Sequence, residues 1–134
     1  MNKSRGFTII ELIVVIAIIA VLAAIVLVNV TAYINKGKDA SIKGNMSTIA
    51  TTAAVFYEGA SDYTGLAANL TVANAVAAIT SANEAPTLTV AGNGTAYCIE
   101  SPLHEGTNWC VDSTGYVGAG TGLCIAGGSA CQSL

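Results

Sequence analysis

The sequence predicts an α+β fold, in which one long N-terminal α-helix, hydrophobic in its first half, packs against a small antiparallel β-sheet. Three observations predict it. An unbroken apolar run extends from Leu12 to Val28, an amphipathic helical pattern follows it, and short alternating segments separated by turn residues come later in the chain. The 134 residues suffice for one domain of ordinary size.

The apolar run is long enough to cross a membrane. Leu12 to Val28 comprises 17 residues without a polar side chain, and the chain carries no charge from Leu12 to Asn35. Because about 20 helical residues cross a bilayer core, the run predicts a single membrane-spanning helix. Lys3 and Arg5 precede it, so the positive-inside tendency places the N-terminus in the cytoplasm.

Glu11 is the only charged residue between Phe7 and Val28. A charge near a bilayer centre costs roughly 2.5 kcal/mol or more, so such a residue usually marks a function with a specific partner. A cleaved secretory signal, with small residues such as Ala20 and Ala23, and a plain membrane anchor are two alternatives. Neither alternative explains a glutamate at the start of the span.

The residues from Lys3 to Leu12, KSRGFTIIEL, resemble the class III signal of type IV pilins and pseudopilins. The resemblance implies that a prepilin peptidase cuts after Gly6 on the cytoplasmic side and that the new N-terminal residue, Phe7, is N-methylated. It also implies the type IV pilin fold. The expected segments are a leader peptide (1–6), a hydrophobic transmembrane or filament-core helix (7–35), its amphipathic continuation (36–58) and a globular head with a small β-sheet and a disulfide-stapled C-terminal region (59–134).

Glu11 is the expected assembly residue, because in the resembled family this glutamate pairs with the N-terminal amine of a neighbouring subunit. An alternative is that Glu11 caps its own helix at the positive N-terminal end, and the two roles are compatible. Many relatives carry a proline or glycine inside the apolar helix. This chain has neither between Phe7 and Lys36, so the resemblance does not extend to that helix breaker.

The helical pattern resumes after Gly37 and predicts that the stem helix continues to about Glu58. Its apolar stripe, at steps of three and four residues, comprises Ala40, Ile42, Met46, Ile49, Ala50, Ala53, Ala54 and Tyr57. The turn residues between Gly59 and Gly65 are expected to end this helix. A short helix or loop is expected over Leu66–Ile79.

Four short segments predict an antiparallel sheet of three or four strands laid on the stem helix. They are Thr87–Val90, Thr95–Glu100, Trp109–Asp112 and Tyr116–Val117. The aromatic residues are expected in the core of the head rather than in a binding stripe; they are Tyr57, Tyr63, Tyr97, Trp109 and Tyr116.

The four cysteines, Cys98, Cys110, Cys124 and Cys131, predict disulfides formed in an oxidising compartment. Three pairings are possible. We favour Cys98–Cys110 across neighbouring strands and Cys124–Cys131 closing a Gly-rich C-terminal loop. A zinc site is an alternative that lacks C-x₂-C spacing, and a nucleophile built with His104 would need a reduced cysteine.

The charges are divided along the chain. All five basic residues lie in the first 43 positions, whereas six acidic residues and no lysine or arginine follow Gly44. Such a surface repels phosphate, so we expect no nucleic-acid binding by this subunit. Asp112, followed by Ser113 and Thr114, is expected to form a capped turn rather than a calcium loop, since one carboxylate is too few. We expect no metal and no other cofactor.

The resemblance implies a structural subunit, not an enzyme, that polymerises as a homo-oligomer into a helical filament used for adhesion, motility or DNA uptake. The precursor would lie in the inner (cytoplasmic) membrane, and its expected partners are prepilin peptidase and the pilus assembly machinery of that membrane. After assembly the filament would be extracellular. The alternatives are a pseudopilin of a type II secretion system and a membrane-anchored extracytoplasmic binding domain that keeps residues 1–6.

Overall fold

The computed structural model describes residues 6–82, 86–90, 94–120, 124 and 130–131. In chain order the elements are α1 (Ile9–Ala60), the 3₁₀ helix η1 (Leu66–Ala68), α2 (Leu70–Ala82), β1 (Thr87–Val90), β2 (Tyr97–Pro102), β3 (Asn108–Asp112) and β4 (Val117–Gly120). Contacts divide the chain into two compact units, residues 1–34 and 35–134, and α1 contributes to both. A long N-terminal helix with a small antiparallel sheet confirms the predicted α+β fold.

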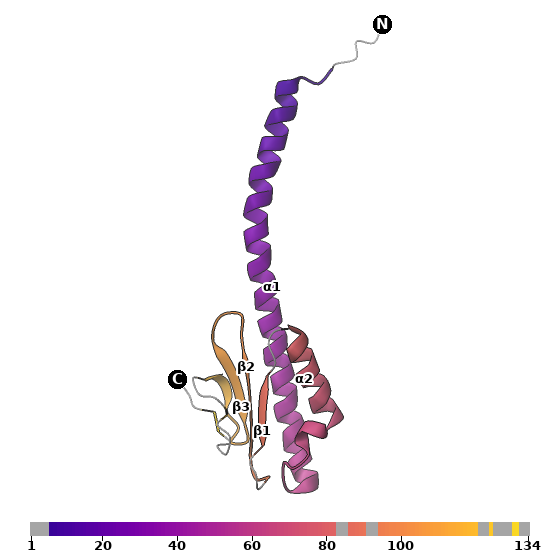
Figure 1. Cartoon of the computed structure of the whole chain (residues 1–134), viewed down its shortest axis with the longest axis vertical. Helices are drawn as coiled ribbons and strands as arrows, with labels where there is room; N and C mark the ends of the chain where they lie inside the picture. The colour runs from indigo at the N-terminus through magenta and orange to yellow at the C-terminus, as the bar shows by residue number, and fades with distance from the viewer. Residues whose placement is uncertain (1–5, 83–85, 91–93, 121–123, 125–129, 132–134) are drawn as a thin grey trace. The chain divides into compact units, whose positions relative to one another are not determined.

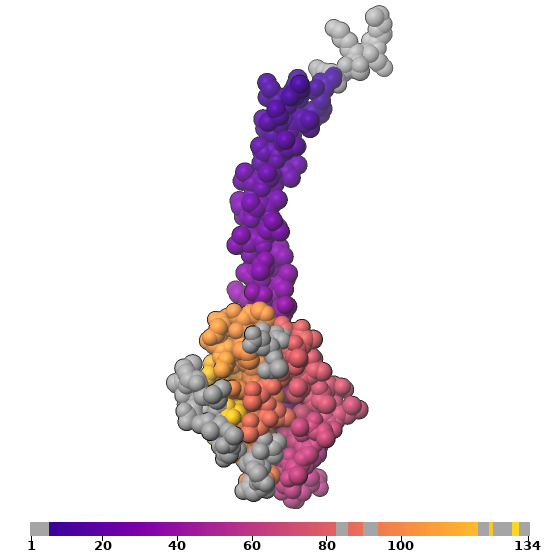
Figure 2. Space-filling model, viewed as in Figure 1, coloured from indigo at the N-terminus to yellow at the C-terminus, as the bar shows by residue number. Residues whose placement is uncertain are grey.

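The first unit consists of the apolar half of α1. Every side chain from Gly6 to Ile34 is exposed, including large aliphatic ones such as Ile16 and Leu22, and the indigo and violet atoms in Figure 2 belong to this segment. The helix is long and apolar enough to cross a membrane, judged by length and composition. Since a helix that is hydrophobic all round is stable only in an apolar environment, this unit requires lipid or neighbouring helices around it.

The second unit begins with the amphipathic half of α1, whose buried side chains follow a helical period. The buried stripe consists of Asp39, Ile42, Met46, Ile49 and Ala53. Ile42 to Ala53 confirm the predicted stripe, whereas Ala40, Ala54 and Tyr57 are exposed. A buried aspartate, which the apolar pattern did not predict, extends the stripe towards the N-terminus.

Helix α1 ends two residues later than the predicted Glu58. Ser61 adopts a left-handed backbone conformation, with φ of 60°, and its N–H donates to the carbonyl of Tyr57 at 2.7 Å. This is a left-handed C-terminal cap, in which an otherwise orphaned carbonyl is satisfied. After η1, Asn69 starts α2 because its side-chain oxygen accepts from the N–H groups of Thr71 and Val72.

The sheet has the strand order β1-β2-β3-β4, and every neighbouring pair is antiparallel. Figure 1 labels β1, β2 and β3. Strand β1 matches its predicted bounds. Strand β2 begins at Tyr97 rather than Thr95, and β4 extends to Gly120 rather than ending at Val117. The expected Gly-rich C-terminal loop lies largely outside the described residues.

One core joins α1, α2 and the inner face of the sheet. It contains Ile42, Met46, Ile49 and Ala53 from α1, Val72, Ala75 and Ile79 from α2, and Tyr97, Ile99 and Val111 from the sheet. Trp109 packs against this core and Tyr63 lies within it. Tyr57 and Tyr116 are not core residues, because Tyr57 is 41% exposed and Tyr116 is only partly buried.

Alternation along the strands sends a different set of side chains to the opposite face, which we call the outer face. Cys98 and Glu100 on β2, with Cys110 and Asp112 on β3, lie on this face because Ile99 and Val111 between them point into the core. All four are buried. The outer face therefore carries cysteines and carboxylates where a sheet surface ordinarily faces water.

Candidate assembly site and the cysteine-linked face of the sheet

The start of α1 is organised by a reciprocal pair, Thr8 and Glu11. The Glu11 carboxylate oxygen Oε2 accepts from the Thr8 backbone N–H at 2.9 Å and from the Thr8 hydroxyl at 2.7 Å, and the Glu11 N–H donates to Thr8 Oγ1 at 3.3 Å. This is a capping box, with Thr8 as N-cap and Glu11 three residues later. The alternative that Glu11 caps its own helix is therefore observed.

Capping leaves part of the Glu11 carboxylate for another partner. All three hydrogen bonds use Oε2 or the Glu11 N–H, and Oε1 takes part in none of the hydrogen bonds found among the described residues. The capping box places the carboxylate at the first turn, beside the N–H groups that carry the positive end of the helix dipole. One oxygen is thus fixed by the helix, and the exposed carboxylate has its second oxygen for another partner.

Gly6 and Phe7 precede the helix and lie outside its hydrogen-bonded turns. Both are exposed, and the Phe7 side chain is 81% exposed. The peptide bond between them is one residue before the N–H that Glu11 binds. Cleavage after Gly6 and methylation at Phe7 stay predictions, and they require no unfolding of α1.

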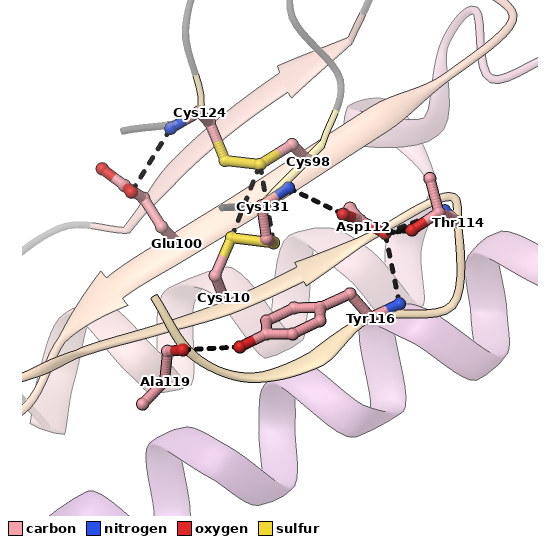
Figure 3. The surroundings of a disulfide bond; sticks show 9 residues. All are labelled: Cys98, Glu100, Cys110, Asp112, Thr114, Tyr116, Ala119, Cys124 and Cys131. Carbon is pink, nitrogen blue, oxygen red and sulfur yellow. Dashed lines mark hydrogen bonds between the residues drawn. A yellow bond between two sulfur atoms is a disulfide. The ribbon is translucent and has the colours of Figure 1, made fainter. Parts of the chain in front are cut away.

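The cysteines form disulfides in a pairing that differs from the favoured one. Cys98 is bonded to Cys124, and Cys110 is bonded to Cys131 (Figure 3). The predicted pairing of Cys98 with Cys110 and Cys124 with Cys131 is therefore wrong. Each disulfide links a sheet strand to the C-terminal region, over sequence separations of 26 and 21 residues.

The strand register explains why the two strand cysteines do not pair. Cys98 lies opposite Asp112, and Cys110 lies opposite Glu100, so the cysteines are diagonal neighbours rather than direct partners. Their sulfur atoms are nevertheless only 3.6 Å apart. The prediction that Cys98 and Cys110 lie on neighbouring strands is confirmed. The register of these strands is set by Ile99 and Val111, which lie opposite each other and enter the core together.

The outer-face carboxylates hold the same C-terminal residues that the disulfides hold. The Cys124 N–H donates to Glu100 Oε2 at 3.3 Å, and the Cys131 N–H donates to Asp112 Oδ2 at 2.6 Å. Figure 3 shows both bonds beside the disulfides. Sequence reasoning did not single out Glu100, although its place two residues after a cysteine on the same strand was a usable signal.

Asp112 also builds the turn between β3 and β4, as predicted for a capped turn. Its Oδ1 accepts from the Thr114 N–H, the Thr114 hydroxyl and the Tyr116 N–H. Burial acts to raise the pKa of Asp112, but the hydrogen bonds from Thr114, Cys131 and Tyr116 outweigh it and lower the pKa below its ordinary value. Donors thus engage both carboxylate oxygens.

A second carboxylate, Asp39, was missed by sequence reasoning. Asp39 Oδ1 accepts from the His104 N–H at 2.8 Å and lies 3.0 Å from His104 Nδ1, and Oδ2 accepts from the Glu105 N–H at 3.2 Å. Burial acts to raise its pKa, but these hydrogen bonds and the His104 ring outweigh burial and lower it. Its position in the sequence could have identified it, because Asp39 precedes Ile42 by three residues and so lies on the buried face of α1.

The cysteines and His104 do not form a catalytic or metal-binding arrangement in this state. The sulfurs of Cys98, Cys110 and Cys124 lie within 4.8 Å of one another, but each belongs to a disulfide. Zinc binding and nucleophilic attack both use the thiolate. His104 lies in the loop between β2 and β3, where it binds Asp39.

Comparison with known proteins agrees with the N-terminal geometry. Residues 1–27 match the family model of the prokaryotic N-terminal methylation motif. This motif is the class III signal of type IV pilins and pseudopilins, so the chain carries the signal of that class of filament proteins. No curated protein and no solved structure matches the chain significantly. The motif supports a type IV pilin or pseudopilin, and it implies processing by prepilin peptidase and assembly into a pilus.

Proposed function

We propose that this chain is the structural subunit of a type IV pilus and polymerises through its N-terminal helix into an extracellular filament. In this proposal prepilin peptidase removes residues 1–6 by cutting between Gly6 and Phe7, and the Phe7 amine is methylated. Residues 7–35 hold the precursor in the inner membrane. They then form the filament core, with residues 36–58 continuing the stem and residues 59–134 forming the exposed head.

The exposed apolar surface of the first unit supports polymerisation. From Ile9 to Ile34 the helix is exposed on all sides, and its large side chains are almost entirely Ile, Leu and Val. Lipid covers such a helix in the precursor. Because a bundle of identical helices provides the same apolar surroundings, subunits can leave the membrane without exposing this surface to water. A head-to-tail contact that does not close into a ring then produces an open filament.

The observation that carries the proposal is the placement of Glu11 beside the methylation site. Its carboxylate binds the Thr8 N–H, one residue beyond the amine that cleavage would create at Phe7. A carboxylate inside an apolar bundle is costly unless a cation pairs with it. The Phe7 ammonium of a neighbouring subunit is such a cation, and loss of one partner of a buried pair costs about 3–5 kcal/mol. Subunits in the wrong axial register would leave Glu11 unpaired.

The second unit supports a surface pilus over a pseudopilin. Two disulfides tie the C-terminal region to the sheet, which suits a protein exposed outside the cell. A calcium loop, as some pseudopilins have, would need several free carboxylates. Donors already engage both oxygens of Asp112. In this proposal the subunit catalyses no reaction, and its partners are copies of itself, prepilin peptidase and the pilus assembly machinery.

Intact-mass spectrometry of material sheared from the cell surface tests the proposal. The expected species begins at N-methylated Phe7 and is lighter by four hydrogens than the reduced chain, because two disulfides have formed. A Gly6→Val variant is the control, since a side chain at the cleavage position should leave residues 1–6 attached and abolish the sheared species.

Two other outcomes would overturn the proposal in favour of a named alternative. A processed chain that is found in the cell envelope but is absent from sheared material would indicate a pseudopilin of a secretion system. A chain that keeps residues 1–6 in cells with active prepilin peptidase would instead indicate a membrane-anchored extracytoplasmic binding domain.

A further inference from the structure

The outer face of the sheet repeats one arrangement on two neighbouring strands. On β2, Cys98 is followed two residues later by Glu100, and on β3, Cys110 is followed two residues later by Asp112. The antiparallel register places Cys98 opposite Asp112 and Glu100 opposite Cys110. Cysteines and carboxylates therefore alternate across the strand pair, and all four side chains are at most 5% exposed.

Each strand holds one C-terminal cysteine at two points. The sulfur of Cys124 is bonded to Cys98, and its backbone N–H donates to Glu100 at 3.3 Å. The sulfur of Cys131 is bonded to Cys110, and its backbone N–H donates to Asp112 at 2.6 Å. In both cases the carboxylate binds the residue whose sulfur is bonded to the cysteine of the same strand (Figure 3).

Proximity of the sulfurs does not by itself select this pairing. Cys98 Sγ lies 3.6 Å from Cys110 Sγ and 4.0 Å from Cys131 Sγ, so both other pairings of Cys98 need only small movements. The outer-face positions of β2 and β3 nearest the disulfides, 98, 100, 110 and 112, also offer no aliphatic side chain, because Ile99 and Val111 point to the core. In the part of the chain that the structure describes, Cys124 and Cys131 differ at the sheet surface in which carboxylate accepts the backbone N–H.

We propose that Glu100 and Asp112 are positioning residues that select the disulfide pairing during oxidative folding. In the reduced chain, Glu100 binds the Cys124 N–H and holds that thiol beside Cys98. Asp112 binds the Cys131 N–H and holds that thiol beside Cys110. The sheet packed on its helices thus presents a template on which Cys124 and Cys131 are sorted before any sulfur–sulfur bond exists.

The chemical step needs an oxidant of the disulfide class. One cysteine thiolate attacks the oxidant disulfide, forms a mixed disulfide and releases one oxidant thiol. The thiolate of the cysteine held beside it then attacks the protein sulfur of that mixed disulfide and releases the second oxidant thiol. Each protein disulfide therefore gives two electrons and two protons to one oxidant disulfide, and the carboxylates determine only which thiolate performs the second attack.

A competition within three-cysteine variants tests the role of Glu100. In Cys110→Ser, Cys98 can pair with either Cys124 or Cys131. The detergent-solubilised full chain is reduced, reoxidised with oxidised glutathione, quenched by alkylation and mapped by mass spectrometry without reduction. We expect Cys98–Cys124 to dominate. Adding Glu100→Ala should lower the ratio of Cys98–Cys124 to Cys98–Cys131 on the order of tenfold, as expected for a lost hydrogen bond to a charged group.

Two matched variants separate positioning from general stability. Glu100→Gln keeps an acceptor oxygen in the same place and should restore most of the Cys98–Cys124 preference. Glu105→Ala removes an exposed carboxylate in the β2–β3 loop and should leave the preference unchanged. An unaltered ratio in Glu100→Ala would overturn the proposal, as would an equal loss in Glu105→Ala.

The same competition on β3 keeps the proposal testable if one variant fails to fold. In Cys98→Ser, Cys110 chooses between Cys131 and Cys124. Asp112→Ala should lower the Cys110–Cys131 share. Since Asp112 also binds the turn, Thr114→Ala is the control, because it removes a turn contact and keeps the bond to Cys131. A loss as large in Thr114→Ala would assign the effect to the turn and overturn the role of Asp112.

Discussion

The carboxylate of Asp39 holds the backbone N–H of His104 at 2.8 Å, across 65 positions of sequence. The same carboxylate accepts from Glu105, so one buried side chain on α1 anchors the whole turn between β2 and β3. Lys43, one helical turn later, pairs with Glu105 at 3.1 Å and lies 4.7 Å over the Trp109 ring. Both α1 side chains bind the loop between β2 and β3, but Asp39 is buried and Lys43 is partly exposed.

Replacing Asp39 should destabilise the second unit markedly. Asp39→Ala leaves the N–H groups of His104 and Glu105 without their acceptor, and we expect a loss of about 2–3 kcal/mol in the free energy of unfolding. Urea unfolding of the detergent-solubilised chain, followed by near-ultraviolet circular dichroism, measures it. Glu58→Ala on the exposed surface of the same helix is the control and should change stability by less than ~0.5 kcal/mol. Equal effects of the two variants would contradict an anchoring role.

The Lys43 contacts should matter much less. Lys43→Met keeps the apolar stem of the side chain and removes both the ion pair with Glu105 and the cation–π contact with Trp109. Because the ion pair is partly exposed, we expect a loss of at most about 1 kcal/mol, and a smaller one at high salt. Unfolding in low and high salt checks this, and a loss as large as that of Asp39→Ala would contradict it.

Acid should weaken the second unit through Asp39 and Asp112. Both groups, which lie beyond the predicted membrane segment, have folded pKa values below the ordinary value of 3.8. Their contribution to stability is therefore fully present above that value and is lost as pH falls through the lower folded pKa values. Unfolding measured from neutral pH downwards should show a decline that begins near the ordinary pKa.

A double variant isolates these two groups from the remaining carboxylates. Asp39→Asn with Asp112→Asn removes the titration but keeps only one of the two acceptor oxygens of each side chain, so the double variant should be less stable at neutral pH and its acid decline should be shallower. A decline that is equally steep in the double variant would assign acid sensitivity to other residues.

Two substitutions at the start of α1 separate capping from assembly. Glu11→Gln keeps a capping-box side chain but removes the charge. Thr8→Val removes the capping hydroxyl and keeps the charge, at about 1 kcal/mol of helix stability. We expect Glu11→Gln to reduce the yield of sheared filaments by on the order of tenfold or more, whereas Thr8→Val leaves most of it.

The amount of each variant in the membrane provides the internal control for that comparison. Both variants should insert into the membrane, because the apolar run is unchanged, and immunoblots of membrane fractions should find equal amounts. If the two variants lose filaments to the same extent, the capping box rather than the charge carries the effect, and the proposed pairing of Glu11 with a neighbouring amine would be wrong.

A side chain at Gly94 should destabilise the second unit more than a side chain at Gly106. Its φ is +68°, and an added Cβ would lie 2.5 Å from Thr64 Oγ1. Gly106 has a similar φ of +85° but open space around the added atom. Gly94→Ala should therefore cost about 3 kcal/mol of unfolding free energy, and Gly106→Ala about 1 kcal/mol from backbone strain alone. Thermal unfolding of both variants measures these losses. Equal losses in the two variants would show that the contact with Thr64 is not what makes Gly94→Ala unstable.

Periodicity predicted those parts of the fold that one element determines alone. The steps of three and four residues placed Ile42, Met46 and Ile49 on one face of α1, and all are buried. Alternation placed β1 within its observed bounds. The end of α1 was displaced by two residues because Ser61, not a glycine, adopts the left-handed cap.

Contacts between distant residues could not be predicted in the same way. Asp39 occupies an apolar phase of its helix, but its donors come from a loop 65 positions later, and nothing local identifies them. Cys98 and Cys110 were placed on neighbouring strands, yet the bonded partners are Cys124 and Cys131. Four cysteines allow three pairings, and spacing alone does not rank them.

The sequence by itself determined the N-terminal half of this protein, because the chemistry there is contiguous. A basic leader, a glycine, a glutamate at the start of the helix and an apolar run are read in order, and they predict a helix without reference to the rest of the chain. Tertiary structure decided the rest. Only the register of β2 against β3 sets Cys98 beside Asp112 and Glu100 beside Cys110. That register depends on core packing of Ile99 and Val111, which is a property of the assembled sheet and helix.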